Sequence, residues 1–277
     1  MKKNIVSLVI KWAILVVVLV AIYMPLALIV VYSFSGARNV GEDFGSFTFS
    51  LYTNLLSDEK LLKATANTLI IGLVSALLAT ILGTTAAIGI HYMTSRKRKA
   101  VDAASQITVV NAEIVTAMGF FLLMLTLRDT ISLPFDFGLV WLIIAHTVIT
   151  TPYVILTVSP RLKQLNPNLL EASMDLGAGP MRSLITVMIP QLLGSMISAF
   201  ALAFTLSLDD FVVANANRVG RSEAIDTIST YVYEGIKLKL NSDIRALSTI
   251  IFVAVLAVLI VVNVVKNNKA KKNSQHQ

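Results

Sequence analysis

Six stretches of the chain are almost wholly apolar, and polar segments separate them. Each is about 20 residues long, which is the length that an α-helix needs to cross the hydrocarbon core of a bilayer. Their approximate bounds are 12–34, 68–92, 105–127, 138–158, 191–213 and 246–265. The pattern predicts an all-α integral membrane protein with six transmembrane helices, so that both termini lie on the same side.

The composition agrees with a membrane protein. The 277 residues are 56% hydrophobic and only 14% charged, whereas a soluble globular protein has about a quarter charged residues. The first stretch follows Lys2 and Lys3, as in a secretory signal, but it is too long for a signal core and has no clear cleavage site. We therefore expect it to be retained as the first span. The absence of cysteine excludes disulfides and thiolate metal sites.

The distribution of charge predicts the orientation. If both termini are cytoplasmic, the inner segments carry most of the basic residues, including the run Arg96 to Lys99, and the outer segments carry most of the acids. The net charge of +7 then reflects topology, so we expect no nucleic-acid partner, because such a site would gather its basic residues on one soluble face. Residues 266–277 are expected to form a basic, disordered cytoplasmic tail.

A polar segment between the fourth and fifth stretches has the signals of two short helices. It reads NPNLLEASMDLGAGPMRSLITVMIPQ, from Asn166 to Gln191. Asn166 and Pro167 are typical of a helix start, Gly177 of a left-handed helix end, and Pro180 of a second start. These features alone leave two interpretations open, a helical hairpin that lies on the membrane or a docking element for a cytoplasmic partner.

The same segment resembles the EAA loop of the permease subunits of ABC importers. The matching residues are Glu171, Ala172, Ser173 (in place of a second Ala), Gly177, Ile189 and Pro190. The resemblance extends from about Asn67 to the last span, and it implies a type I importer permease (MetI-like) fold. It also implies three parts: a first helix and external loop at 1–66, a core of five helices at 67–265 whose loop 159–190 couples to an ATPase, and the tail 266–277.

No ATP-binding motor is visible in the chain. The P-loop pattern GxxxxGK[ST] does not occur, and GAGPMRS lacks the lysine that would reach the phosphates. We therefore expect no catalytic residues, no cofactor and no metal on this chain. The resemblance implies a sister permease that completes a heterodimer, two copies of a cytoplasmic ATPase that bind ATP and Mg, an extracytoplasmic substrate-binding protein, and a site in the membrane lipid of the bacterial cytoplasmic (inner) membrane.

Three carboxylates fall within or at the end of apolar stretches, where charge is costly and usually functional. Asp209 and Asp210 lie about 28 Å along the fifth stretch, and because they point about 100° apart, one of them is expected to face a pathway. Glu113 lies about 13 Å into the third stretch. The simpler alternatives are a helix end that meets water and an ion pair, but the six stretches contain no Lys or Arg.

Negative groups at two depths fit a long cationic solute better than a metal ion, which needs several converging ligands. Aromatic rings could add cation–π contacts or simply pack, and the candidates are Phe204, Phe211, Tyr153 and Trp141. His146 has no helical partner at i+4 that could share a metal, so we expect a hydrogen-bonded packing residue, with a ligand or a proton relay as the alternative.

A second resemblance narrows the class of solute that the chain is expected to transport. FTLSLDDFVVAN, followed by ISTYVYEGIKLKLNSDIRALSTI, resembles the C-type permease subunit of spermidine/putrescine importers, and NAEIV resembles that family's acidic motif. The resemblance implies ATP-driven polyamine import with Glu113 as a pathway acid, and it does not separate putrescine from spermidine. Two departures are Ala112, where the family has proline, and Arg218 near the proposed entry.

Three other functions remain open at this point. A related ABC permease for another small solute would differ in its pathway charges. A secondary transporter driven by an ion gradient would leave the loop 159–190 without a role. A membrane-embedded enzyme lacks support, because the sequence has no H-E-x-x-H, no G-x-S-x-G and no cysteine nucleophile.

Overall fold

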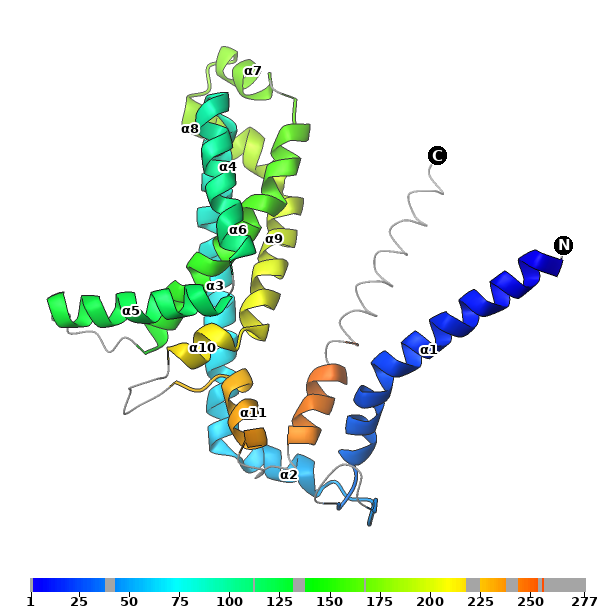
Figure 1. The fold of residues 1–277 in the computed structure, drawn as a ribbon. Coiled ribbons are helices and arrows are strands. Elements are labelled where there is room, and N and C mark those ends of the chain that lie inside the picture. Colours follow the sequence, from blue (N-terminus) through cyan, green and yellow to red (C-terminus); the bar gives the residue numbers. More distant parts are fainter. Residues whose placement is uncertain are drawn as a thin grey trace. The chain divides into compact units, whose positions relative to one another are not determined.

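The structure is a computed structural model, and it describes residues 2–37, 43–111, 113–131, 138–166, 168–217, 225–237, 244–253 and 256. Apart from one isolated bridge between Ser35 and Phe47, the regular structure of these residues is helical. In chain order the helices of Figure 1 are α1 (Lys2–Tyr32), α2 (Ser50–Ser57), α3 (Glu59–His91), α4 (Ser95–Val110), α5 (Glu113–Ile131), α6 (Leu139–Gln164), α7 (Leu169–Asp175), α8 (Pro180–Ser183), the π-helix η1 (Leu184–Met188), α9 (Ile189–Asp209), α10 (Val212–Ala216) and α11 (Ile228–Lys237). The prediction of an all-α chain is confirmed for the described residues.

Among these residues, four helices are long and apolar enough to cross a membrane. They are Val9–Tyr32, Glu59–His91, Leu139–Gln164 and Pro180–Asp209, and they match the first, second, fourth and fifth predicted stretches. A shorter apolar helix, Ile244–Val253, begins the sixth stretch. The rest of that stretch and the tail 266–277 lie outside the described residues.

The third predicted stretch is not one continuous helix. Helix α4 ends at Val110 and α5 begins at Glu113, with Asn111 in an extended conformation (ψ 143°) between them. The side-chain amide of Asn111 donates a hydrogen bond to Thr116 Oγ1 (3.1 Å). An asparagine that bonds locally in this way offers the chain an alternative to helix, which is why an unbroken apolar run can still bend here. The depth of Glu113 counted along a continuous helix is therefore wrong.

The chain divides into two compact units, Leu62–Tyr231 and the combination of Met1–Leu61 with Val232–Gln277. In the terminal unit, four aromatic rings gather after α1, from Phe34, Phe47, Phe49 and Tyr52. The rings of Phe34 and Phe47 are stacked, with their centroids 5.6 Å apart. In the same unit, the buried Arg245 donates to the carbonyl of Ala37 (2.7 Å). These contacts order the segment that follows the first span.

The core of the central unit lies between α3, α6 and α9, which run side by side in Figure 1. Small residues bring these helices close together, and the fully buried ones include Ala76, Ala79, Ala199 and Ala203. At Gly83 of α3, an added Cβ would lie 2.6 Å from Val154 Cβ of α6. Such close approach gives the dispersion contacts that hold helices together in lipid, where burial of apolar surface supplies little driving force.

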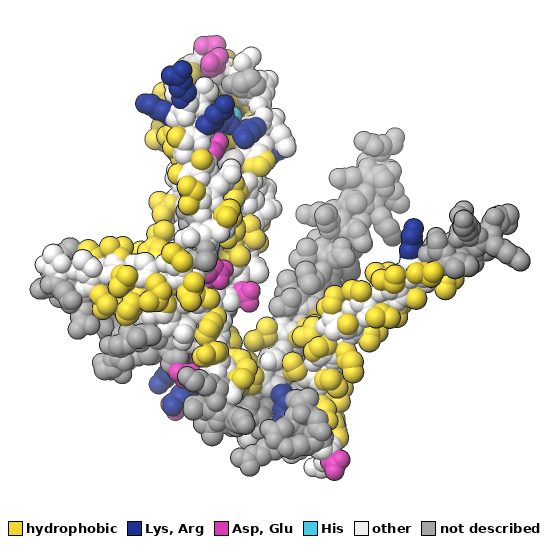
Figure 2. Space-filling model, in the orientation of Figure 1, with side chains coloured by type: hydrophobic (Ala, Val, Ile, Leu, Met, Phe, Trp, Pro, Cys, Tyr) yellow, Lys and Arg dark blue, Asp and Glu magenta, His cyan; other side chains and the backbone are white. Residues whose placement is uncertain are grey.

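The outward faces of the same unit are apolar. On α3, Leu69, Leu73, Leu77 and Ile81 are all exposed at four-residue spacing, and Figure 2 shows hydrophobic side chains along α5. Figure 2 also shows basic side chains gathered near the end of the bundle that carries α7 and α8. A helix that is apolar on its outer side needs lipid or another membrane subunit as its surroundings.

Candidate functional site

Helix α9 ends in a corner that is built by Asp210. The helix stops at Asp209, and Asp210 is extended (ψ 124°). The carboxylate of Asp210 accepts hydrogen bonds from the backbone N–H groups of Ala214 (3.0 Å) and Val213 (3.4 Å) in the first turn of α10. These bonds satisfy donors that a helix start leaves free. The predicted span 191–213 therefore ends about four residues early, because the carboxylate begins a new helix.

This corner turns Asp210 into a pocket. The pocket has about 340 Å³ of empty space, including its open side, and the residues that line it include Glu113, His146, Thr150, Tyr153, Ser207 and Asp210. Glu113 comes from the first turn of α5, and Asp210 from the corner between α9 and α10. Two of the three carboxylates singled out in the sequence thus line one pocket, together with the ring of Tyr153.

His146 lies beside Asp210 at the back of this pocket. Its Nδ1 is 2.8 Å from Ser207 Oγ, and its Nε2 is 3.6 Å from Asp210 Oδ2. The residue is only 3% exposed, and Ser207 Oγ continues the chain of contacts to Ser75 Oγ on α3 (3.1 Å). The prediction of a hydrogen-bonded packing residue is confirmed. Sequence reasoning missed its closeness to Asp210.

The spacing of residues along α6 could have predicted part of the lining of this pocket. His146, Ile149, Thr150 and Tyr153 all line it, and they stand at positions i, i+3, i+4 and i+7 of α6, which share one face of a helix. Ser207 of α9, three residues before Asp210, lines the same pocket. What the sequence could not show is that this face of α6 meets the start of α5.

The other candidate residues lie elsewhere in the central unit. Asp209 is exposed and does not line the pocket, which fits the expectation that the two aspartates point in different directions. Phe204 is stacked on Phe200 (6.2 Å between centroids) and lies against Gly72 of α3. Trp141 is buried and donates its indole N–H to Asn217 Oδ1 (3.0 Å).

Phe211, the last of the predicted aromatic residues, precedes the first turn of α10. It is not among the residues that line the pocket. Ala112 and Arg218, where the chain departs from the family it resembles, lie outside the described residues. In the part of the chain that the structure describes, no group of three or more His, Cys, Asp or Glu side chains could hold a metal ion.

The segment 166–191 has the predicted helix, stop and second start. Helix α7 ends at Asp175, and Gly177 follows two residues later with a φ of +88°, so the left-handed glycine is confirmed. The N–H of Gly177 bonds to the carbonyl of Met174 (2.9 Å), and that of Ala178 bonds to the carbonyl of Ser173 (3.2 Å). This pair of bonds is the Schellman arrangement, which closes a helix end and reverses the chain. Asn166 Oδ1 accepts the N–H of Asn168 (3.0 Å), and Pro167 lies outside the described residues.

The second helix is longer than the short helix that the sequence predicts. From Pro180 the helical path continues through η1 into α9, and Pro180–Asp209 forms one run of 30 residues. In η1 the N–H of Ile189 bonds to the carbonyl of Leu184, five residues back. Pro190 explains this wide turn, because proline cannot donate to the carbonyl four residues before it and its ring collides with that carbonyl in a regular helix.

The two halves of the loop are tied together. Ser173 of α7 donates a hydrogen bond to Ser183 of α8 (2.9 Å), and Ser183 is fully buried. In contrast, Glu171 and Ala172 are exposed, and so are the apolar side chains of Leu176 (90%) and Met181. Exposed apolar and charged groups on a rigid helical tip are typical of a docking surface.

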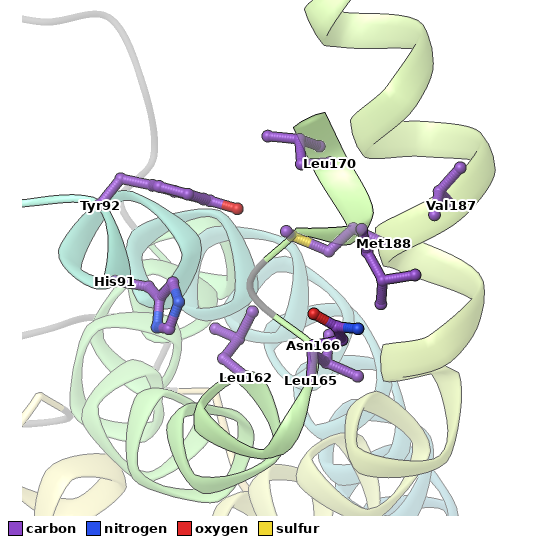
Figure 3. A pocket seen from close by; sticks show the side chains of 9 residues that line it. His91, Tyr92, Leu162, Leu165, Asn166, Leu170, Val187 and Met188 are labelled. Carbon is purple, nitrogen blue, oxygen red and sulfur yellow. The ribbon is translucent and has the colours of Figure 1, made fainter. Parts of the chain in front are cut away.

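The loop lies over a second pocket, shown in Figure 3. Leu170 of α7 faces the ends of three core helices there: His91 and Tyr92 at the end of α3, Leu162 and Leu165 at the end of α6, and Val187 and Met188 of η1. The pKa of Tyr92, which follows α3 directly, is raised by burial and then by the carboxylate of Glu171. Helix α7 therefore lies directly against the ends of the core helices.

The central unit is an apolar helix bundle with an acidic pocket, and an exposed helical loop lies on the ends of its core helices. This is the architecture of a membrane transport subunit that works with partner proteins. The chain belongs to the family described as binding-protein-dependent transport system inner membrane component, which matches residues 79–271. It is accordingly a multi-pass membrane permease, and members of this family are not themselves enzymes.

Two relatives and one solved structure show the extent of the likeness. The chain is 32% identical to the putrescine transport system permease protein PotI of Escherichia coli K12, over 88% of this chain and 86% of that protein. It is 30% identical to the spermidine/putrescine transport system permease protein PotC of Haemophilus influenzae, over 92% and 96%. A chain of a bacterial ABC transporter involved in the import of the acidic polysaccharide alginate superposes with a TM-score of 0.70 at 17% identity, over 94% of both chains. The last comparison shows the fold alone, and it confirms the predicted importer-permease fold.

Proposed function

We propose that this chain is one permease subunit of an ATP-driven importer of polyamines such as spermidine and putrescine, and that it forms the translocation pathway with a sister permease. The observation that carries the proposal is the pair Glu113 and Asp210 in one pocket. Among the described residues that line this pocket, none is Lys or Arg. Two carboxylates with no Lys or Arg beside them favour a cation with more than one ammonium group. The relatives named for putrescine and spermidine support the same substrate class.

Each lining group has a part in holding such a cation. The carboxylates of Glu113 and Asp210 pair with separate ammonium groups, and the ring of Tyr153 offers a cation–π contact for the methylene chain or the ammonium. Asp209 is exposed beside the corner and attracts cations toward it. Phe204, Phe211 and Trp141 shape the surrounding helices by packing.

The loop transmits the work of a separate ATPase. Its exposed residues Glu171 and Ala172 contact the ATPase, while Ser173, Gly177, Ile189 and Pro190 keep the loop rigid and join it to α9. Since Asp210 directly follows α9, movement of the loop reaches the pocket through one helix. ATP and Mg are bound by the ATPase, which is present in two copies, and an extracytoplasmic binding protein delivers the polyamine.

The topology follows from the same proposal. The chain crosses the bacterial inner membrane six times, with both termini in the cytoplasm. The basic side chains near α7 and α8 (Figure 2) support this orientation, because positive charge gathers on the cytoplasmic side.

Uptake into proteoliposomes tests the function. Vesicles containing this chain, its sister permease and the ATPase should take up labelled putrescine and spermidine when ATP is inside and the binding protein is outside. Glu113→Gln should reduce this uptake, whereas Glu59→Gln, at an exposed position outside the pocket, should not. Intact ATP hydrolysis with no polyamine uptake and no stimulation by polyamine would exclude the cationic pathway.

A further inference from the structure

A third pocket lies among the ends of α3 and α6 and the first turns of α4. It has about 200 Å³ of empty space, including its open side, and its polar lining is His91 from α3, Arg98 and Asp102 from α4, and Ser159 and Lys163 from α6. Helices α3 and α6 are both long and apolar enough to cross a membrane, and the pocket lies at their last turns. The last turns of a span lie where the hydrocarbon gives way to lipid headgroups.

This pocket offers positive charge to a ligand. Among the described residues that line it, Arg98 and Lys163 are basic and Asp102 is acidic. The Nε of Arg98 is 4.0 Å from Asp102 Oδ2, which is too long for a hydrogen bond. The N–H groups of the guanidinium therefore remain available to an anion, and their planar arrangement suits a phosphate. Other basic side chains gather at the same end of the bundle (Figure 2) and add to the positive potential.

His91 contributes an unsatisfied polar atom. Its Nδ1 is buried and has no hydrogen-bond partner among the described residues, whereas most buried polar atoms have one. A phosphoglycerol headgroup carries phosphate oxygens that accept hydrogen bonds and hydroxyls that donate them. Such a headgroup can therefore satisfy Nδ1 whether or not this nitrogen carries the proton of the imidazole.

Apolar side chains continue from the pocket toward the middle of the spans. On α6, Leu156 is exposed and precedes Lys163 by seven residues, which places it on the same helix face and about 10 Å along the axis. On α4, Val101 is exposed three residues after Arg98. A free phosphate would leave these apolar side chains uncovered. The occupant that matches the whole surface is anionic at one end and apolar at the other.

We propose that this pocket binds the headgroup of an anionic phospholipid. Arg98 and Lys163 contact the phosphate, His91 bonds to the headgroup, and the acyl chains lie along Leu156. Basic pockets between membrane helices are a known way to hold anionic headgroups. Because His91 also lines the pocket under α7 (Figure 3), the bound lipid lies next to the coupling loop. The inference concerns the lipid-facing surface of the chain and does not rest on polyamine transport.

Lipid titration read by native mass spectrometry tests the site. Phosphatidylglycerol is added to the full-length chain, purified in detergent with its partner subunits and freed of lipid. Replacing both Arg98 and Lys163 with glutamine should weaken binding at one site about tenfold or more. The matched control replaces Arg96 and Lys97 with glutamine. These two basic residues of α4 are exposed and do not line the pocket, so this variant should bind like the wild type.

Two further arms identify the ligand and exclude damage to the fold. Arg98→Lys combined with Lys163→Arg keeps both charges and should retain most of the affinity, and phosphatidylcholine, which has no net charge, should not occupy the site. Four results would overturn the inference: equal binding by the wild type and the glutamine variant, an equal loss in the control, an equal loss in the variant that keeps both charges, or equal binding of phosphatidylcholine. Displacement of the lipid by inorganic phosphate at a similar concentration would indicate a site for soluble anions instead. Because these measurements need no transport, a failure of polyamine uptake would leave their result unchanged.

Discussion

Glu113 and Asp210 line the same pocket, one from the first turn of α5 and the other from the corner where α9 ends. Asp210 also holds that corner, since its carboxylate accepts two backbone N–H groups of α10. One side chain therefore sets the local structure and supplies charge to the pocket.

The two neighbouring aspartates should differ in their effect on uptake. The two bonds from α10 go to different oxygens of Asp210, so Asp210→Asn keeps an acceptor for one of them and also removes a charge from the pocket. Putrescine uptake below saturation should therefore fall about tenfold, or roughly 1.4 kcal/mol. Asp209→Asn removes an exposed charge, and its effect should be about two- to threefold at low salt and should disappear at high salt. Initial uptake rates at low and at high salt measure the effects of both substitutions. Equal losses from the two substitutions would contradict the assignment.

The close contact between α3 and α6 should make Gly83 irreplaceable. In Gly83→Ala the new methyl group would lie 2.6 Å from Val154 Cβ and 3.1 Å from the carbonyl oxygen of Thr151, so the helices must separate at a cost of about 1–3 kcal/mol. Thermal unfolding of the detergent-purified complex should show a lower midpoint. Gly89→Ala is the matched control on the same helix, since nothing lies within 4 Å of its added Cβ. That variant should be neutral or slightly more stable.

Gly177 should be essential for coupling. Its φ of +88° costs an L-residue about 1–2 kcal/mol, so Gly177→Ala should shift the end of α7 and weaken stimulation of ATP hydrolysis by substrate. Gly179→Ala, whose φ of −67° suits any residue, should retain stimulation. ATPase assays with and without the loaded binding protein distinguish the two. Equal stimulation in both variants would exclude a role for the left-handed turn.

The hydrogen bond between Ser173 and Ser183 should be measurable by a double-mutant cycle. Ser173→Ala restores the alanine of the family motif but leaves the buried Ser183 hydroxyl without its partner, at a cost of about 1–3 kcal/mol. Replacing both serines with alanine should cost less than the sum of the single changes. Midpoints of thermal unfolding for the four variants give the coupling, and strict additivity would show that the bond does not stabilise the loop.

The long elements were predictable because their causes are local. Length and hydropathy located the helices of Val9–Tyr32, Glu59–His91, Leu139–Gln164 and Pro180–Asp209, and Gly177 located the end of α7 through its left-handed φ. The breaks at Asn111 and Asp210 were missed, because a single side chain that bonds to nearby groups decides them within a run of favourable hydropathy.

The candidate site was predictable only in part. The cost of burying charge identified Glu113 and Asp210, but their meeting depends on how α5 and α10 pack, which no local pattern encodes. For the same reason, Trp141 was considered for the pathway, whereas its indole N–H is bonded to Asn217. The partners of a buried polar group come from distant parts of the chain.

The packing at Gly83 has a mechanical consequence. Val154 already fills the space beside Gly83, and the ring of Phe204 lies against Gly72. Because helices packed this closely cannot shift past one another without collision, we expect α3, α6 and α9 to move as one body. Change in the pocket is then left to its other walls, the start of α5 and the corner at Asp210. The quantity that varies as these walls move is the separation of two anions. In the proposed polyamine pathway, a flexible dication would be held when that separation matches its own length and released when it does not.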